Sequence, residues 1–185
     1  AYREWCRGER VVAEFVRFNP LSQNQDCARG YAVARDRDVV VIDLAGGAEA
    51  LWSGYPSVQR NMVRKAEKRG LVSGLTTGAE VIPQFAALYD DNMRRLEAGS
   101  YYFFGEDYFR NLATGLGRDL QFFAVRLESR LAAACCVLLY RDRMHYHLSA
   151  SDSELRDAAP VNALLHAVAR WGQDQGYRWL HLGGG

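Results

Sequence analysis

The stretch that decides the fold runs from Arg143 to Leu182 and reads RMHYHLSASDSELRDAAPVNALLHAVARWGQDQGYRWLHL. Its beginning, to about residue 150, is rich in aromatic and apolar side chains and predicts a strand. Pro160 then opens a helix that we expect to reach about Gln175, because apolar residues recur at helical spacing. A last strand is predicted from Tyr177 to Leu182. The apolar stripe of the helix consists of Val161, Leu164, Leu165, Val168 and Trp171.

Two further strands are predicted upstream, over 120–127 and 130–140. Short polar turns at Glu128-Ser129 and Arg141-Asp142 join them to the strand that begins at Arg143, which predicts an antiparallel meander. Before the meander, predicted helices and predicted strands are interspersed along the chain. Helices are expected at about 2–7, 57–70, 80–97 and 106–116, and strands at 11–18, 38–45 and 71–76. This order predicts an α/β (α+β) fold with a mixed, largely antiparallel central sheet flanked by helices.

Some boundaries carry more detailed expectations. The strand at 38–45 is almost continuously apolar, which predicts burial on both of its faces. Ser57 is expected to cap the helix that follows, and Gly70 to end it. Pro83 is expected in the first turn of the next helix.

Composition sets only broad limits. The chain has 185 residues, 49% of them hydrophobic and 24% charged, with a formal net charge of +1, so whole-chain charge favours no class of partner. We interpret the four cysteines (Cys6, Cys27, Cys135 and Cys136) as free, buried thiols of a reducing, cytoplasmic compartment. We expect no signal peptide and no membrane span. The abrupt ends suggest a fragment that is truncated at both ends.

The histidines allow several interpretations. His145 and His147 share one face of their strand, so they could form a metal pair, but zinc needs further ligands and the sequence offers few. We favour polar histidines on a sheet face. A serine nucleophile at Ser149, Ser151 or Ser153 is disfavoured because there is no G-x-S-x-G turn.

Three other features have both a structural and a functional interpretation. The helical stripe of Arg60, Arg64, Lys65 and Lys68 is either a solvated surface or a phosphate-contacting face. The connection GSYYFFGEDYF (Gly99–Phe109) is either helix packing or the floor of a substrate cleft. The helix that Pro160 opens presents free N–H groups, which suit pyrophosphate.

Taken in order, these segments resemble the Fem-type (FemAB/FemX-like) branch of the GNAT acyltransferase superfamily. The resemblance rests on Tyr146, Ser149, Ser151, Glu154, Arg156 and Pro160, followed by LLHAVARWGQDQGYRWLHLGGG, and on earlier segments such as RNMVRKAEKRGL. It implies a GNAT-like fold that transfers an acyl or aminoacyl group to an amine of a cell-envelope precursor or amino sugar. The implied donor is acyl-CoA or aminoacyl-tRNA, and no metal is needed.

The resemblance also implies roles for particular residues. Tyr146, His147 and Ser149 would line the catalytic cleft, with either Tyr146 or His147 relaying a proton. The donor would contact Arg156, Pro160, Val161 and Asn162. The substrate would contact Arg60, Arg64, Lys65 and Tyr102. The chain departs from the GNAT phosphate loop, because Ala159 and Val161 stand where that loop has glycines.

The implied domain organisation is a segment at 1–37, the remnant of a preceding GNAT-like half, followed by a GNAT-like domain at 38–185. The expected partners are the acceptor and a tRNA acceptor end, and a homodimer is possible. The alternatives are a non-catalytic degenerate GNAT module that binds a partner or dimerises, and a two-histidine metalloenzyme.

Overall fold

The computed structural model describes residues 2–183, and the chain divides into two compact units, residues 1–38 and 39–185. In the first unit, α1 (Tyr2–Gly8) forms as predicted, and a short 3-10 helix, η1, covers Asn24–Cys27. The strand predicted at 11–18 is wrong, because the described part of this unit forms no strand. Val12 and Phe15 are almost fully exposed. A β-branched run without a partner strand has no hydrogen bonds to hold it in a sheet.

The second unit is built on a six-stranded sheet with the order β1-β6-β5-β4-β3-β2. All neighbours pair antiparallel except β5 and β6, which are parallel, so the predicted mixed, largely antiparallel sheet is confirmed. The meander lies where the sequence predicts it. The strands are β1 (Val41–Asp43), β2 (Leu71–Thr76), β3 (Leu120–Leu127), β4 (Arg130–Tyr140), β5 (Arg143–Ser151) and β6 (Trp179–His181).

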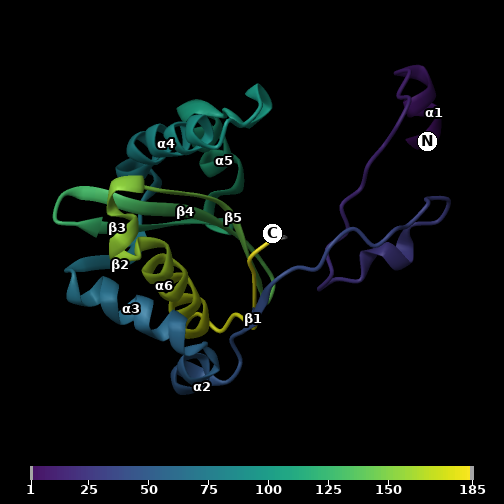
Figure 1. Cartoon of the computed structure of the whole chain (residues 1–185). Helices are drawn as coiled ribbons and strands as arrows, with labels where there is room; N and C mark the ends of the chain where they lie inside the picture. Colours follow the sequence, from purple (N-terminus) through teal and green to yellow (C-terminus); the bar gives the residue numbers. More distant parts are fainter. Residues whose placement is uncertain (1, 184–185) are drawn as a thin grey trace. The chain divides into compact units, whose positions relative to one another are not determined.

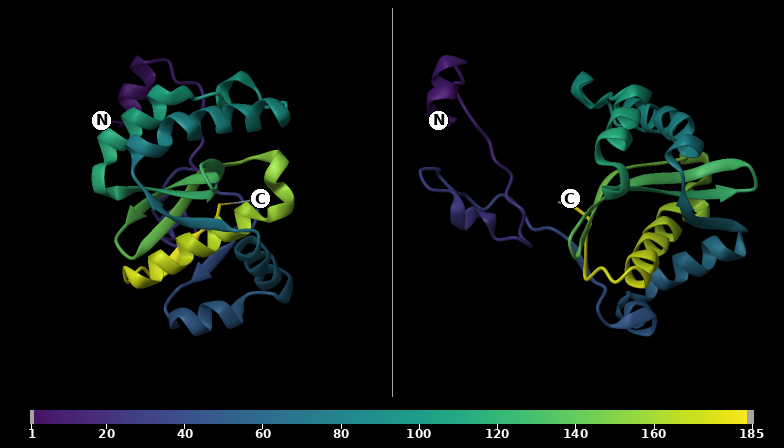
Figure 2. Two further views of the ribbon diagram at one scale, coloured as in Figure 1. Left: turned by 90° about the vertical axis from the view of Figure 1, so that its left-hand side faces the viewer. Right: turned by 180° about the vertical axis from the view of Figure 1, so that it is seen from behind.

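Helices cover both faces of this sheet (Figures 1 and 2). One face carries α4 (Gly78–Arg95) and α5 (Gly105–Leu116), and the other carries α6 (Pro160–Asp174) and α3 (Ser57–Lys68). The short helices α2 (Gly47–Gly54), η2 (Ser100–Tyr102), η3 (Gly117–Asp119) and η4 (Ser153–Ala158) connect these elements.

Each face has its own buried core, because successive strand residues point to opposite sides. Phe123 packs with α6, whereas its neighbour Phe122 packs with α4 and α5. The adjacent cysteines divide in the same way, with Cys135 in the first core and Cys136 in the second. All four cysteines are free as predicted, but Cys27 is exposed and Cys6 only partly buried, so burial holds for Cys135 and Cys136 alone.

The edge strand β1 differs from its prediction. It has three residues rather than eight, and Val40 beside it is 59% exposed. The expected burial on both faces is wrong because β1 is the outermost strand and pairs only with β6. Helix α2 was not predicted, since Gly46-Gly47 indicated a stop and not a helix start.

Two helix starts also differ. Ser57 forms no side-chain cap, because Pro56 occupies the N-cap of α3, although Gly70 follows the helix with φ 79° as expected. Helix α4 begins at Gly78, where Thr77 and Glu80 form a reciprocal capping box, so Pro83 lies in the second turn and not the first. No helix among residues 2–183 is long and apolar enough to cross a membrane.

The feature that positions the site is the separation of β5 from β6. Their parallel pairing covers only Arg143–His145 against Trp179–His181, and β5 then continues to Ser151 with no β6 partner. The pairing of β5 with β4 shifts between Cys136 and Val137, so His147 is the extra residue of a β-bulge. A strand edge therefore opens beside the start of α6.

The close approach of α6 to the sheet can be tested at Gly172. A Cβ there would overlap the sulfur of Met144 and lie 3.0 Å from Leu44 Cδ1. Gly172→Ala is expected to lower the free energy of unfolding by about 1–3 kcal/mol, because overpacking outweighs the gain in helix propensity. Gly115→Ala in α5, where a Cβ meets nothing within 4 Å, should raise it by up to about 1 kcal/mol. Urea unfolding of both variants measures the difference, and two equal gains would contradict this packing.

Candidate functional site

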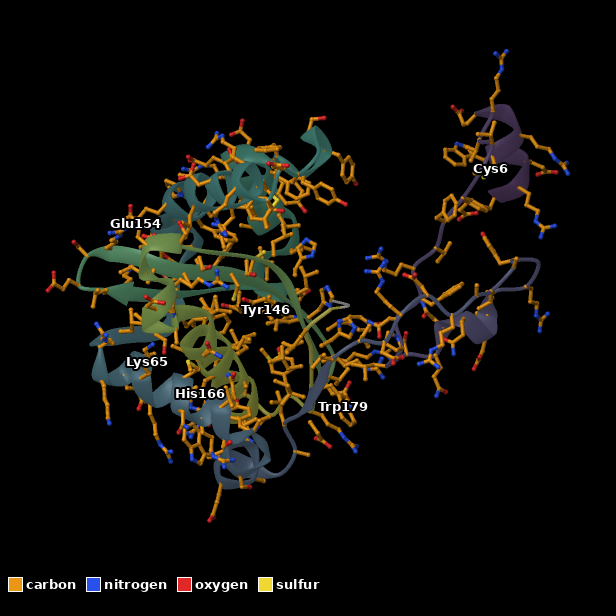
Figure 3. All side chains as sticks on the ribbon, in the orientation of Figure 1. Cys6, Lys65, Tyr146, Glu154, His166 and Trp179 are labelled. Atoms are coloured by element: carbon orange, nitrogen blue, oxygen red, sulfur yellow. The ribbon has the colours of Figure 1, made fainter. Side chains whose placement is uncertain are left out.

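A cleft of about 430 Å³ lies where β5 ends and α6 begins. Three layers contribute to it: α3 and α6 from one face of the sheet, the end of α4 from the other, and the η4 loop between them. Its lining residues are Met62, Lys65, Arg95, Ser151, Ser153, Arg156, Asp157, Ala159, Pro160, Val161 and Asn162. Lys65 on α3 and Glu154 on η4 mark this side of the unit in Figure 3.

The η4 loop is held at its beginning by charged side chains. The Arg130 guanidinium on β4 lies 2.5 Å from both the Asp152 and the Glu154 carboxylates. The other Asp152 oxygen accepts a hydrogen bond from the Glu154 backbone N–H at 2.9 Å. These contacts fix the path of the chain from β5 into the cleft.

At its end the loop adopts a conformation that favours glycine. Ala159, the N-cap of α6, has φ 58° and ψ 45°, in the left-handed region, and its side chain is buried. The sequence departs from the GNAT phosphate loop at this position, where that loop has a glycine. The backbone therefore has the turn that a glycine would provide, and an alanine provides it under strain.

The cleft is electropositive. Lys65, Arg95 and Arg156 contribute three cations against one carboxylate, Asp157. The first turn of α6 adds the positive end of the helix dipole. Its backbone N–H groups have no acceptor within the helix, and Pro160 has no N–H group. Such an arrangement is suited to bind a phosphate or another anion.

Arg95 reaches the cleft from the opposite helical layer, and Asn92 positions it. The buried Asn92 amide donates hydrogen bonds to the Leu88 carbonyl at 2.8 Å and to the Ser151 carbonyl at 2.9 Å. Its oxygen accepts a hydrogen bond of 2.8 Å from the Arg95 guanidinium. Neither Asn92 nor Arg95 was predicted from the sequence. Nothing near the end of a predicted helix indicates that Asn92 contacts Ser151, 59 residues further along the chain.

The predicted donor residues Arg156, Pro160, Val161 and Asn162 all line the cleft. Asn162 also donates a hydrogen bond of 2.6 Å to Gln59 Oε1, which ties the first turn of α6 to α3.

Of the four predicted substrate residues, only Lys65 lines the cleft. The Arg60 guanidinium donates hydrogen bonds to the Tyr55 and Ser53 carbonyls at the end of α2. Arg64 lies over the Trp52 ring, 5.2 Å from its centroid. Tyr102 is 52% exposed on η2 and is not among the cleft residues.

The predicted catalytic residues Tyr146, His147 and Ser149 lie along β5, on two faces. Tyr146 packs with the α6-side core, and Figure 3 shows it between the helical layers. Ser149 pairs with Cys135 of that same core, whereas His147 contacts α5 on the other face. Burial raises the pKa of the Tyr146 hydroxyl well above its usual range, which the nearby Ser149 opposes. This hydroxyl makes no hydrogen bond of normal geometry within residues 2–183.

His147 is a half-buried, neutral imidazole. Its Nε2 lies 3.4 Å from the Tyr108 hydroxyl of α5, and burial lowers the pKa of His147. His145 lies on the same face, with 6.0 Å between the two ring centroids. In the described part of the chain, no group of three or more His, Cys, Asp or Glu side chains is arranged to hold a metal ion.

A family model described as an acetyltransferase (GNAT) domain matches residues 57–185. No curated protein matches the chain.

Among solved structures, FemX is similar with a TM-score of 0.71 and 15% identity, over 80% of this chain and 52% of that one. The structure described as L-PGS from Bacillus licheniformis has a TM-score of 0.56 and 16% identity. The C-terminal domain of a putative lysylphosphatidylglycerol synthetase from Agrobacterium fabrum has a TM-score of 0.58 and 12% identity. Each of these two covers 80% of this chain and 46% of its own. The chain thus spans about half the length of these proteins, and the likeness is one of fold.

The strain at Ala159 can be tested by substitution. Ala159→Gly is expected to raise the free energy of unfolding by about 1 kcal/mol, because an L-residue in the left-handed region costs roughly 1–2 kcal/mol and glycine entropy offsets part of that gain. Ala158→Gly is the matched control. Ala158 is not among the positive-φ residues, so its substitution should lower the free energy of unfolding by about 0.5–1 kcal/mol. Denaturant unfolding that shows equal losses for both would contradict the strain.

Proposed function

Because the chain belongs to the acetyltransferase (GNAT) domain family, we propose that it is an N-acyltransferase whose phosphate-bearing acyl donor binds in the cleft at the start of α6. The family match and the fold shared with FemX confirm the predicted resemblance. One observation carries the proposal: three cations from three different segments, Lys65, Arg95 and Arg156, converge on a helix N-terminus at the end of the central strand.

The donor lies along the open edge of β5. Its phosphate occupies the cleft beside Ser151, and its acyl end reaches toward Tyr146. Because His147 is bulged, these positions lie opposite Val137 and Ala133 of β4, four strand residues apart, a distance of about 13 Å. Because β6 leaves this edge after His145, an extended donor arm with amide groups can take the place of a paired strand.

The reaction is acyl transfer to an amine. The amine nitrogen attacks the donor carbonyl, a C–N bond forms, the bond from the carbonyl carbon to the leaving sulfur or oxygen breaks, and the amine loses a proton. Tyr146 remains protonated at neutral pH because its pKa is raised. It therefore serves as a hydrogen-bond donor to the developing oxyanion or the leaving group rather than as a base.

The acceptor proposed from the sequence is an amine of a cell-envelope precursor or amino sugar, in the cytoplasm. One structurally similar protein is described as a putative lysylphosphatidylglycerol synthetase, and this supports an envelope component as acceptor. The donor proposed from the sequence is acyl-CoA or aminoacyl-tRNA. Both donors carry phosphate, so the cleft has the same role for either.

A non-catalytic module is the second candidate, and one observation favours it. Ala159 and Val161 bear side chains where glycines would let a pyrophosphate approach the backbone. Isothermal titration calorimetry with acetyl-CoA, and separately with a charged tRNA, distinguishes the two candidates. Binding of either ligand supports the enzyme, and binding of neither supports the module.

The cleft cations should determine donor affinity. Lys65→Gln, Arg95→Gln and Arg156→Gln are each expected to raise the donor Kd by about tenfold or more, because a hydrogen bond to a charged group contributes roughly 1.5–3 kcal/mol. Lys68→Gln is the control, on the same helix as Lys65 but outside the cleft. Calorimetric titration measures all four variants. An equal weakening by Lys68→Gln would mean that the general field, and not the cleft, attracts the donor.

The assignment of Tyr146 predicts a separation of kinetic constants. Tyr146→Phe removes only the hydroxyl and is expected to lower kcat by about 10²-fold with little change in KM, because the hydrogen bond strengthens in the transition state. Tyr140→Phe, at the exposed end of β4, should leave both constants unchanged. Steady-state assays with the donor that binds provide the test, and a fully active Tyr146→Phe enzyme would exclude this role.

A further inference from the structure

Two histidines meet where β5 and β6 stop pairing. His145 and His181 are the last paired residues of the two strands, and their imidazole rings stack with centroids 4.8 Å apart. The two Nδ1 atoms lie 2.7 Å from each other, a hydrogen-bond distance that requires one proton between them.

The hydrogen bonds assign the tautomers of this pair. The Gly183 backbone N–H donates to His181 Nδ1 at 3.3 Å, so this nitrogen is an acceptor. We assign His145 Nδ1–H as the second donor to it, and the proton of His181 to Nε2. The two donors share the single lone pair of His181 Nδ1. In this arrangement the Nε2 of His145 carries a free lone pair.

The other nitrogen of His181 is unsatisfied. His181 is 7% exposed, and its Nε2 is fully buried with no hydrogen-bond partner within residues 2–183. A buried N–H without an acceptor costs about 1–3 kcal/mol, and such groups in folded proteins usually have a partner. A ligand atom placed here would accept this hydrogen bond.

The surroundings keep the pair uncharged. Burial, with additional effects from His181 and His147, lowers the pKa of His145 to about 4, and burial lowers the pKa of His181 as well. The titratable side chains on this face include His147, whose ring lies 6.0 Å from that of His145, and Tyr108, which contacts His147 from α5. Strand alternation also places Arg143 of β5 and Asp43 of β1 on this face, and neither is among the causes of these shifts. A neutral imidazole with a free lone pair can accept a hydrogen bond from an amine or ammonium N–H.

The position of the pair complements that of Tyr146. Met144 and Leu180, the neighbours of His145 and His181, belong to the α6-side core, so the two histidines face the opposite side of the sheet. A donor beside Tyr146 and an acceptor beside His145 would approach the gap between β5 and β6 from opposite faces.

We propose that His145 is the catalytic base that takes the proton of the acceptor amine, and that His181 positions its ring. This inference rests on the proposed acyl transfer. As the amine nitrogen bonds to the acyl carbon, one N–H proton passes to His145 Nε2, while Nδ1–H stays hydrogen-bonded to His181. The leaving group takes its electron pair with it, and the proton on His145 returns to solvent.

Side-chain ¹⁵N NMR of the unmodified chain tests the amine site without any acyl donor. Titration with n-butylamine is expected to shift the ring nitrogens of His145 and His181 and not those of His166, which packs against Tyr55 and Trp52. The shifts should persist at neutral pH and disappear as the pH falls toward about 4, because protonated His145 no longer accepts a hydrogen bond. The alcohol n-butanol is the uncharged control. Unshifted His145 and His181 rings, equal shifts at His166, or a proton on His145 Nε2 would each overturn the proposal.

Kinetics separates this inference from the proposed function. With the donor that binds, His145→Gln is expected to lower kcat by about 10²-fold or more and to regain activity with added imidazole, while the donor Kd is unchanged. His166→Gln is the matched control and should remain active. Full activity of His145→Gln overturns the inference but leaves the acyltransferase proposal intact. Absence of donor binding in the wild-type chain overturns that proposal, and the amine titration then still decides whether the pair binds an amine.

Discussion

The parting of two parallel strands is the constraint on which the rest of the site depends. Only three residue pairs join β5 to β6, and α6 connects the two strands across one face. Because a parallel connection needs a crossover helix, the start of α6 must lie near the end of β5. That single geometric requirement places a helix N-terminus, a strand end and a free strand edge beside one another. The side chains of Lys65, Arg95 and Arg156 line the cleft at this point.

The sheet also separates the two side chains that we propose for proton transfer. The α6 face holds Tyr146, whose buried hydroxyl keeps its proton, and the opposite face holds His145, whose burial keeps it neutral. Low-dielectric surroundings shift the two pKa values in opposite directions, since burial disfavours the charged form of each group. One strand thus presents a proton donor on one side and a proton acceptor on the other, and adjacent residues alternate between them.

Much of the fold follows from local sequence. The apolar meander and the helix that Pro160 opens are predicted because their pattern and turn residues agree. The proposed donor residues Arg156, Pro160, Val161 and Asn162 line one cleft because they belong to one short segment of the chain. The strand at 11–18 fails for lack of a partner, which composition does not reveal. Arg95, Asn92 and His181 join the site only through tertiary contacts, so no local pattern marks them. The separation of Arg60 and Arg64 from Lys65 likewise depends on α2, which the sequence analysis did not predict.

The proposed acyltransferase function depends most on where the donor phosphate binds. Backbone amide NMR of Val161 and Asn162, during titration with coenzyme A and in parallel with an RNA minihelix that carries the tRNA acceptor end, tests this directly. At least one ligand is expected to bind, with its largest shifts at these two amides and around Lys65. Binding that leaves these signals in place, or no binding by either ligand, would contradict the proposed function.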